Sequence, residues 1–166
     1  STSIARMDTS PPARLNTPAL KPLVIKEKSA FATESDSATR KFIKEIKRIQ
    51  PDVIHIHNIH GYFLNYKILF EFLASANIPI VWTVHDCWLY TGHCYYYSFV
   101  QCNRWKTHCN NCPQKKSFPA SFCIDRSQRN FSDKQQAFSS IPKDRLTIVP
   151  VSIWIRDEMR YSFLKD

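Results

Sequence analysis

The sequence predicts an α/β fold built around a parallel β-sheet. Three short runs rich in β-branched and apolar residues have the composition of strands: Val53–His57, Ile80–Val84 and Leu146–Val149. Segments with helical periodicity precede and separate these runs. Since strands that alternate with helices form βαβ units, we expect the strands to be parallel.

Four helices are expected around these strands. In the first, at residues 39–49, apolar side chains recur on one face, Lys and Arg cover the other, and Pro51 ends the helix. Asn65 has the residue type and position of an N-cap for a second helix that runs to about residue 76. The remaining two helices are expected at residues 125–138 and 152–163.

The chain divides into two parts by composition. Residues 1–36 contain several prolines among Ser, Thr and Ala and show no lasting periodicity, which predicts an extended or poorly ordered arm. Residues 37–166 are expected to form one partial domain that carries a cysteine-rich insert at residues 87–123. Because the chain begins with serine rather than methionine, a fragment or a processed product is expected.

Charge and glycine content restrict the classes of partner. The 23 basic and 14 acidic residues give a net charge of +9, which favours phosphate-bearing partners, but the basic residues are spread along the chain and indicate a solvated surface. The two glycines are too few for a G-x-G-x-x-G loop or a P-loop within these residues. No apolar run or export signal stands out, so a cytoplasmic location is expected.

The insert contains four cysteines with a spacing typical of metal ligands. They are Cys94, Cys102, Cys109 and Cys112, and the last two form a C-x2-C pair. Thiolates in a non-redox site favour zinc, and four sulfur ligands leave no position for a reacting water, so the predicted zinc is structural.

Other readings of the insert stay open. His93, His108 or Cys87 could replace one sulfur as a ligand. Alternatively, the cysteines are buried thiols without metal, since free cysteine packs as a small hydrophobic residue, and Cys123 is expected to be such a residue.

Polar side chains follow two of the predicted strands directly. His85 and Asp86 come after one strand, and Asn58, His60 and Gly61 come after the preceding one. In open parallel sheets ligands bind beyond the carboxyl ends of the strands, so these residues are the candidate site. His55 is expected to be structural. Cys87 could be a nucleophile, but the neighbouring carboxylate disfavours its thiolate.

Five motifs occur in order along residues 37–164. They are Pro51–Tyr62 (PDVIHIHNIHGY), Val81–Trp88 (VWTVHDCW), Thr91–Cys94 (TGHC), Trp105–Lys116 (WKTHCNNCPQKK) and Val149–Ile155 (VPVSIWI). Together they resemble the amino-terminal domain of bacterial retaining glycosyltransferases of family four. The most similar subgroup builds capsular and exopolysaccharide chains.

The resemblance implies a partial Rossmann-like domain of the GT-B arrangement, in which the first domain binds the acceptor. It implies that His85, with Asp86, lies at the catalytic centre, and that Asn58, His60 and Gly61 line the acceptor side. The acceptor would be a sugar or a lipid-linked sugar, with a peripheral contact at the inner face of the membrane. A nucleotide-sugar donor would bind a second domain, so the chain alone is expected to be inactive.

Two features depart from the family pattern: the glycine-rich turn of the first strand is missing, and His108 stands where relatives commonly have glycine.

An alternative function is a zinc-stabilised nucleic-acid-binding module. The net charge, the C-x2-C pair and a possible stacking surface of Tyr95, Tyr96, Tyr97 and Trp105 favour it. The flanking parallel sheet is not explained by that alternative, and nucleic acid is the less favoured partner.

Overall fold

The structure, a computed structural model, describes residues 19–25, 36–60, 64–117 and 124–165. Within these residues the centre of the molecule is a four-stranded sheet in the order β1-β2-β3-β4. All three strand pairs are parallel, which confirms the predicted fold class and agrees with a partial Rossmann-like domain. The strands are β1 (Pro22–Ile25), β2 (Val53–Ile56), β3 (Ile80–Val84) and β4 (Leu146–Pro150).

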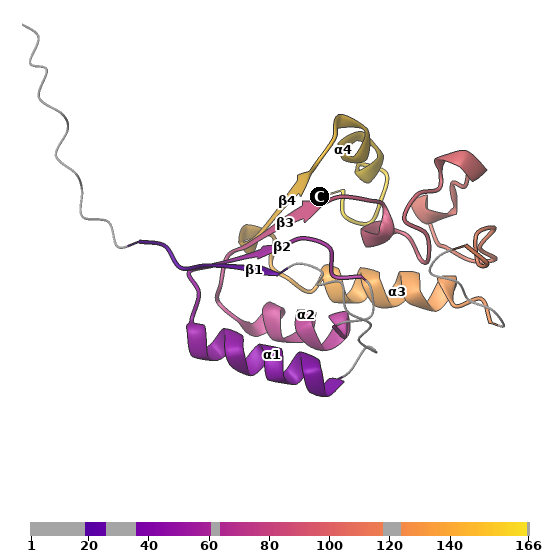
Figure 1. Cartoon of the computed structure of the whole chain (residues 1–166). Coiled ribbons are helices and arrows are strands. Elements are labelled where there is room, and N and C mark those ends of the chain that lie inside the picture. Colours follow the sequence, from indigo (N-terminus) through magenta and orange to yellow (C-terminus); the bar gives the residue numbers. More distant parts are fainter. Residues whose placement is uncertain (1–18, 26–35, 61–63, 118–123, 166) are drawn as a thin grey trace, which may run out of the picture.

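Three of the longer helices form a layer along one face of the sheet (Figure 1). They are α1 (Asp36–Ile49), α2 (Tyr66–Ser75) and α3 (Ser127–Phe138). Each connects two consecutive parallel strands, and right-handed crossovers that step in one direction across a sheet place their helices on the same side. The last helix, α4 (Ile153–Met159), follows β4 and lies on the other side of it in this view.

The strand β1 lies inside the segment for which the sequence analysis expected only an arm. Its residues pair with β2 from Pro22 opposite Val53 to Ile25 opposite Ile56. Pro22 is tolerated because it begins an edge strand, where a missing N–H breaks no ladder. The Asp52 carboxylate accepts a hydrogen bond from the Lys21 N–H at 2.8 Å and so holds the start of the strand. Its short apolar run follows several prolines, which favoured an extended arm over a strand in the sequence.

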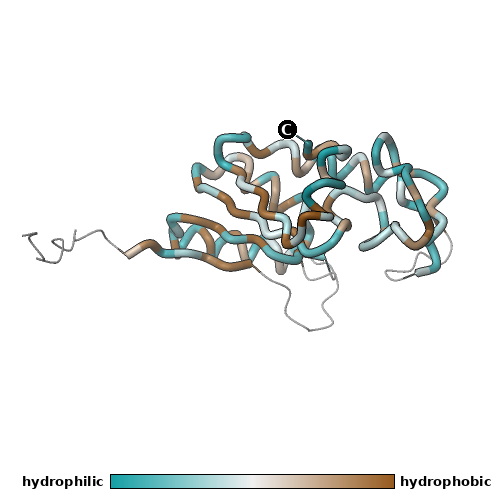
Figure 2. Tube along the Cα trace, turned by 90° about the horizontal axis from the view of Figure 1, so that it is seen from above, coloured by the Kyte–Doolittle hydropathy of each residue, from teal (hydrophilic) through white to brown (hydrophobic). Residues whose placement is uncertain are grey.

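The core lies between the sheet and the helix layer. Ile54, Ile56 and Trp82 are at most 3% exposed on that face of the sheet. The Trp82 ring lies 5.0 Å from Phe70 of α2 and 4.9 Å from Phe138 of α3, measured between centroids. In Figure 2 hydrophobic segments concentrate in this region, whereas the insert carries more hydrophilic ones.

The predicted helix caps are confirmed, while two helix boundaries differ. The Asn65 side chain accepts from the Lys67 N–H at 3.0 Å, and the Ser152 hydroxyl accepts from the Ile155 N–H at 3.2 Å. The first helix begins at Asp36, earlier than expected, and the last ends at Met159 rather than near residue 163. No helix among the described residues is both long and apolar enough to cross a membrane.

Candidate functional site

The candidate site lies where β2 and β3 end. A pocket there is lined by residues of the loop after β2 and of the loop after β3, together with part of β3 itself. Because β2 and β3 are neighbouring parallel strands, their carboxyl ends open onto the same edge of the sheet. Among the lining residues are Asn58, His60, His85, Asp86 and Trp88.

Two side-chain pairs join the loops across this pocket. His57 Nδ1 lies 3.0 Å from His85 Nε2, and His60 Nε2 lies 2.8 Å from Asp86 Oδ2. In the histidine pair one ring must donate and the other accept, so the two facing nitrogens share a single proton. The pocket therefore holds three histidines and one aspartate from two loops, joined as two hydrogen-bonded pairs.

Asp86 holds His60 in one orientation. Its second oxygen, Oδ1, accepts a hydrogen bond from the Trp88 N–H at 2.8 Å, which fixes the carboxylate. The His60 and Asp86 side chains are only 12% and 13% exposed. Aromatic rings flank His60, with centroids at 5.4 Å for Trp88 and 4.5 Å for Tyr95. When Nε2 of a neutral His60 carries the hydrogen and donates it in a hydrogen bond to the carboxylate, Nδ1 is the ring nitrogen that can accept a hydrogen bond.

His55 lies within β2 and does not line the pocket. His55 Nε2 shares a hydrogen bond with Thr83 Oγ1 at 2.8 Å, and its ring lies 4.3 Å from that of His57. These contacts link β2 to β3 and support the His57 ring, in agreement with the structural role predicted for His55.

Most of the predicted site residues therefore meet in one place. Asn58, His60, His85 and Asp86 all line the pocket, whereas Gly61 lies outside the described residues. Trp88, Tyr95 and Tyr96 were not predicted to belong to this pocket, and the two tyrosines were considered only as a stacking surface for nucleic acid. The Tyr96 hydroxyl nevertheless donates to the His85 carbonyl at 3.1 Å. The sequence shows that aromatic residues are frequent just after β3, but it does not show where their rings point.

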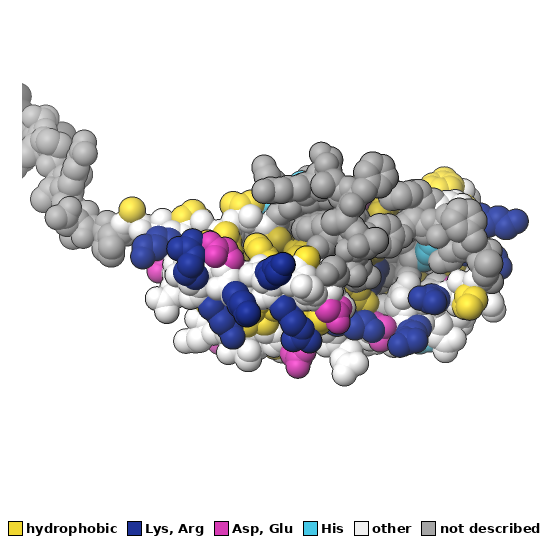
Figure 3. Space-filling model, turned by 60° about the horizontal axis from the view of Figure 1, so that its bottom comes forward, with side chains coloured by type: hydrophobic (Ala, Val, Ile, Leu, Met, Phe, Trp, Pro, Cys, Tyr) yellow, Lys and Arg dark blue, Asp and Glu magenta, His cyan; other side chains and the backbone are white. Residues whose placement is uncertain are grey.

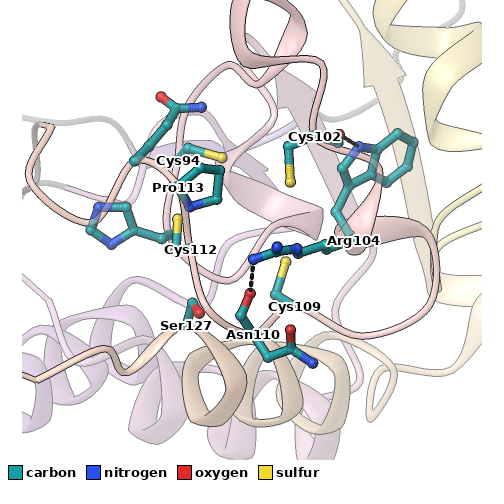
Figure 4. A pocket seen from close by; sticks show the side chains of 11 residues that line it. Cys94, Cys102, Arg104, Cys109, Asn110, Cys112, Pro113 and Ser127 are labelled. Carbon is teal, nitrogen blue, oxygen red and sulfur yellow. Dashed lines mark hydrogen bonds between the residues drawn. The ribbon is translucent and has the colours of Figure 1, made fainter.

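A second cluster lies in the insert. Cys94, Cys102, Cys109 and Cys112 line one small cavity, and Figure 4 shows their sulfur atoms directed toward a common space. All five cysteines that the structure describes are free thiols. Within the described ranges no group of three or more His, Cys, Asp or Glu side chains has an arrangement that could hold a metal ion, so zinc is not shown.

The alternative ligands for this cluster are placed differently. His93 lines the same cavity, whereas Cys87 does not. His108 packs edge-on against Phe131 at 5.5 Å, and Cys123 is outside the described residues. Burial raises the pKa of the Cys87 thiol to about 12, which further disfavours a nucleophilic role for it.

Comparison with known proteins agrees with these features. Residues 7–112 match the family model described as Glycosyltransferase Family 4, a range that includes most of the segment expected to be an arm. A protein of Escherichia coli (strain K12), named as a colanic acid biosynthesis glycosyl transferase, WcaC, is 36% identical over 94 residues. That match covers 53% of this chain but only 22% of the relative, so the chain spans about a fifth of its length. No solved structure matches the chain, and nothing in these comparisons supports a nucleic-acid-binding module.

Proposed function

Because this chain belongs to glycosyltransferase family 4, we propose that it forms the acceptor side of a retaining, nucleotide-sugar-dependent hexosyltransferase of polysaccharide biosynthesis. The observation that carries this proposal is the pocket at the carboxyl ends of β2 and β3, where His60 meets Asp86 and His57 meets His85. In open α/β sheets this edge is where ligands bind.

Within this pocket His85 and Asp86 are proposed as the catalytic residues. His85 is held by His57 at 3.0 Å and by a hydrogen bond from Tyr96 to its carbonyl, so the ring has a defined position from which to contact the donor sugar. Asp86 lines the pocket beside His85, and its carboxylate also orients His60 and the backbone at Trp88.

Asn58, His60 and Gly61 are proposed to bind the acceptor. A sugar hydroxyl needs partners that both donate and accept, and the Asn58 amide and the Nδ1 atom of His60 offer these functions. The Trp88 and Tyr95 rings that flank His60 are apolar surfaces on which a sugar ring can pack. The donor nucleotide-sugar is proposed to bind a second domain that is not part of this chain, which would leave the chain alone inactive.

The exposed face of α1 is proposed to contact the inner face of the membrane, where a lipid-linked acceptor would lie. Basic side chains gather on the helix side of the molecule in Figure 3, more closely than their spread along the sequence indicated. Anionic lipid attracts such a face at about 1 kcal/mol per basic residue. The exposed basic residues of α1 are Arg40, Lys41, Lys44, Lys47 and Arg48.

Zinc is proposed as a structural ion of the insert and not as part of the reaction. The thiol cavity and the histidine pocket share no lining residue. A site closed by four sulfur ligands has no free position for a reacting group.

Binding experiments on the chain test the acceptor assignment. We would measure binding of a short polyprenyl-diphosphate-linked hexose in micelles, by NMR, to the chain and to His60→Gln, with His108→Gln as the matched control. Saturable binding that His60→Gln weakens about tenfold and His108→Gln leaves unchanged would support the assignment. Equal binding by all three proteins, or tight stoichiometric binding of UDP-glucose or GDP-fucose, would contradict it.

A further inference from the structure

The insert contains a small cavity that four thiols line. The four thiols that line it come from separate parts of the insert: Cys94 precedes the 3-10 helix Ser98–Val100, Cys102 follows it, and Cys109 and Cys112 come after the 3-10 helix Arg104–Lys106. The cavity has a volume of about 10 Å³. That is the space of about one water-sized sphere.

The backbone around the thiols is shaped to bring them together. Asn111, inside the C-x2-C pair, has a left-handed conformation with φ of 42°, which a non-glycine residue rarely adopts. Gly92 packs so closely that a Cβ would lie 2.1 Å from the Ser127 carbonyl oxygen and 2.8 Å from Cys109 Cβ. Only glycine fits there, and its N–H donates to Cys109 Sγ at 3.2 Å. A hydrogen bond of this kind favours the thiolate.

Two buried polar side chains accompany the thiols: His93 lines the cavity, and Lys134 lies on α3. His93 is 6% exposed, and its Nε2 atom has no hydrogen-bond partner among the described residues. Lys134 is 2% exposed; its Nζ donates to two backbone carbonyls, but no ion pair in the described part of the chain includes it. Because a buried ammonium without an opposite charge is costly, a negative charge near Lys134 would be stabilising.

A zinc site made of the four thiols would supply that charge. A divalent cation binds the thiolate forms of cysteine and releases their protons. Four thiolates with one Zn²⁺ carry two net negative charges. Lys134 Nζ donates to the carbonyl of Thr91, which precedes Cys94 in the insert, so its ammonium lies near such a site.

Lys134 also connects this cavity to the histidine pocket. Its Nζ donates to the carbonyls of Trp88 at 2.7 Å and Thr91 at 2.9 Å, at the two ends of the 3-10 helix Trp88–Tyr90, and lies 3.6 Å from the Trp88 ring centroid. The Trp88 N–H in turn donates to Asp86, which holds His60. A continuous set of contacts therefore runs from the thiols to the pocket.

We propose that Cys94, Cys102, Cys109 and Cys112 bind one Zn²⁺ as thiolates, and that Lys134 neutralises this site and links it to the Asp86–His60 pair. His93 donates from Nε2 to one of the bound sulfurs. Zinc then sets the position of the Trp88–Tyr90 helix, and Lys134 is a positioning residue for the pocket. The proposal deepens the structural role given to zinc above, but it does not depend on sugar transfer.

The first experiment measures metal in the whole chain, purified under reducing conditions, by mass spectrometry. About one zinc per chain is expected, and replacement by Co²⁺ should produce the intense sulfur-to-cobalt charge-transfer absorption of a tetrahedral thiolate site. No metal after incubation with Zn²⁺, or an iron–sulfur chromophore, would overturn the proposal. If no metal binds and the chain still binds the acceptor, the proposed function stands and only this inference is rejected.

Variants separate a ligand role from a packing role. Cys102→Ser, at a half-buried position, is expected to lower zinc retention against a chelator by at least about tenfold. Cys87→Ser is the matched control, because Cys87 is a buried thiol outside the cavity, and it should retain one zinc. Equal retention by the two variants would rule out the ligand set.

The link to the pocket has its own test. In ¹⁵N NMR spectra of the zinc-loaded chain, removal of zinc should shift the His60 ring signals, and Lys134→Met should shift them in the same direction with zinc still bound. The backbone amide of Leu73, a buried residue of α2 that lines neither cavity, is the internal control for changes that are not specific to the pocket. His60 signals that stay fixed in both cases would disprove the positioning role of Lys134.

Discussion

His60 Nε2 lies 2.8 Å from Asp86 Oδ2, although 26 residues separate the two positions in the chain. The pair spans the loops that follow β2 and β3, and each partner is also held by Trp88, through its ring and through its N–H. The orientation of a histidine at the acceptor side is thereby set by a carboxylate on the neighbouring strand. Changes at either strand end are expected to affect the same pocket.

Asp86→Asn is expected to change the tautomer of His60. The amide can still accept from the Trp88 N–H, so the backbone should keep its position, but the charged acceptor for the His60 proton is lost. Asp86→Ala removes both hydrogen bonds and should lower the free energy of unfolding by about 1.5–3 kcal/mol. Ring ¹⁵N shifts and urea unfolding measure the two effects. An Asn variant whose His60 spectrum equals that of the native protein would refute the orienting role.

The buried Lys134 should make the stability of the metal-free protein depend on pH. Burial lowers its pKa from 10.5 to about 7, while Cys109, Cys94 and Asp86 act in the opposite direction. Between these two pKa values Lys134 is protonated in the unfolded chain but largely neutral in the folded one, so the unfolded chain binds more protons than the folded chain. The free energy of unfolding therefore rises with pH, by at most about 1.4 kcal/mol per pH unit.

The useful window for this measurement is pH 7 to 8, because above it the thiols of the unfolded chain ionise. Burial raises the pKa of Cys87 and Cys94 in the folded protein to about 12 and that of Cys109 to about 11, so stability falls again as the pH rises further. Urea unfolding of reduced, metal-free protein at pH 7, 7.5 and 8 should show the rise, and Lys134→Met should abolish it. A rise of the same slope in the variant would assign the effect to another group.

Gly92→Ala should destabilise the insert. The new methyl group would overlap the Ser127 carbonyl oxygen, which belongs to the backbone at the start of α3 and cannot rotate away. Overpacking of this kind costs about 1–3 kcal/mol. A lower thermal midpoint is expected by calorimetry, with the exposed Lys116→Ala as control. An unchanged midpoint would show that α3 can move away from the insert.

Arg145 stabilises the carboxyl-terminal end of α2. Its guanidinium donates to the carbonyls of Leu73 at 3.2 Å and Ala74 at 2.7 Å, and also to that of Ala76. The last carbonyls of a helix lack partners within it. Arg145→Met should therefore lower the free energy of unfolding by about 1–3 kcal/mol. Lys143→Met, at an exposed neighbouring position, should change urea unfolding far less, and equal losses would contradict this role.

Neutral substitutions on α1 test the proposed membrane contact. The triple variant Lys41→Gln, Lys44→Gln, Lys47→Gln should weaken sedimentation with vesicles that contain anionic lipid, at about 1 kcal/mol per residue. Lys116→Gln, Lys143→Gln, Lys165→Gln changes the net charge equally and serves as control. If both triple variants bind alike, the total charge and not the α1 face governs binding.

Much of this molecule was predictable because its signals are local. Apolar runs and helical periodicity predicted three of the four strands that the structure describes and the longer helices. Asn65 and Ser152 were identified as caps because a cap bonds to backbone N–H groups only two or three residues away. β1 was missed because its four residues become a strand only through pairing with β2.

The features of the site also divide into those that the sequence predicts and those that it does not. The sequence by itself determined that polar residues follow two strands and that all six cysteines, four of them with the spacing of metal ligands, lie in one insert, since order and spacing are properties of the chain. Only the tertiary structure decided that His60 faces Asp86, that His57 faces His85, and that Lys134 lies beneath Trp88. These contacts depend on the register between β2 and β3 and on the packing of α3, which no local pattern encodes, because each arises from side chains far apart in sequence whose directions are set by the whole core.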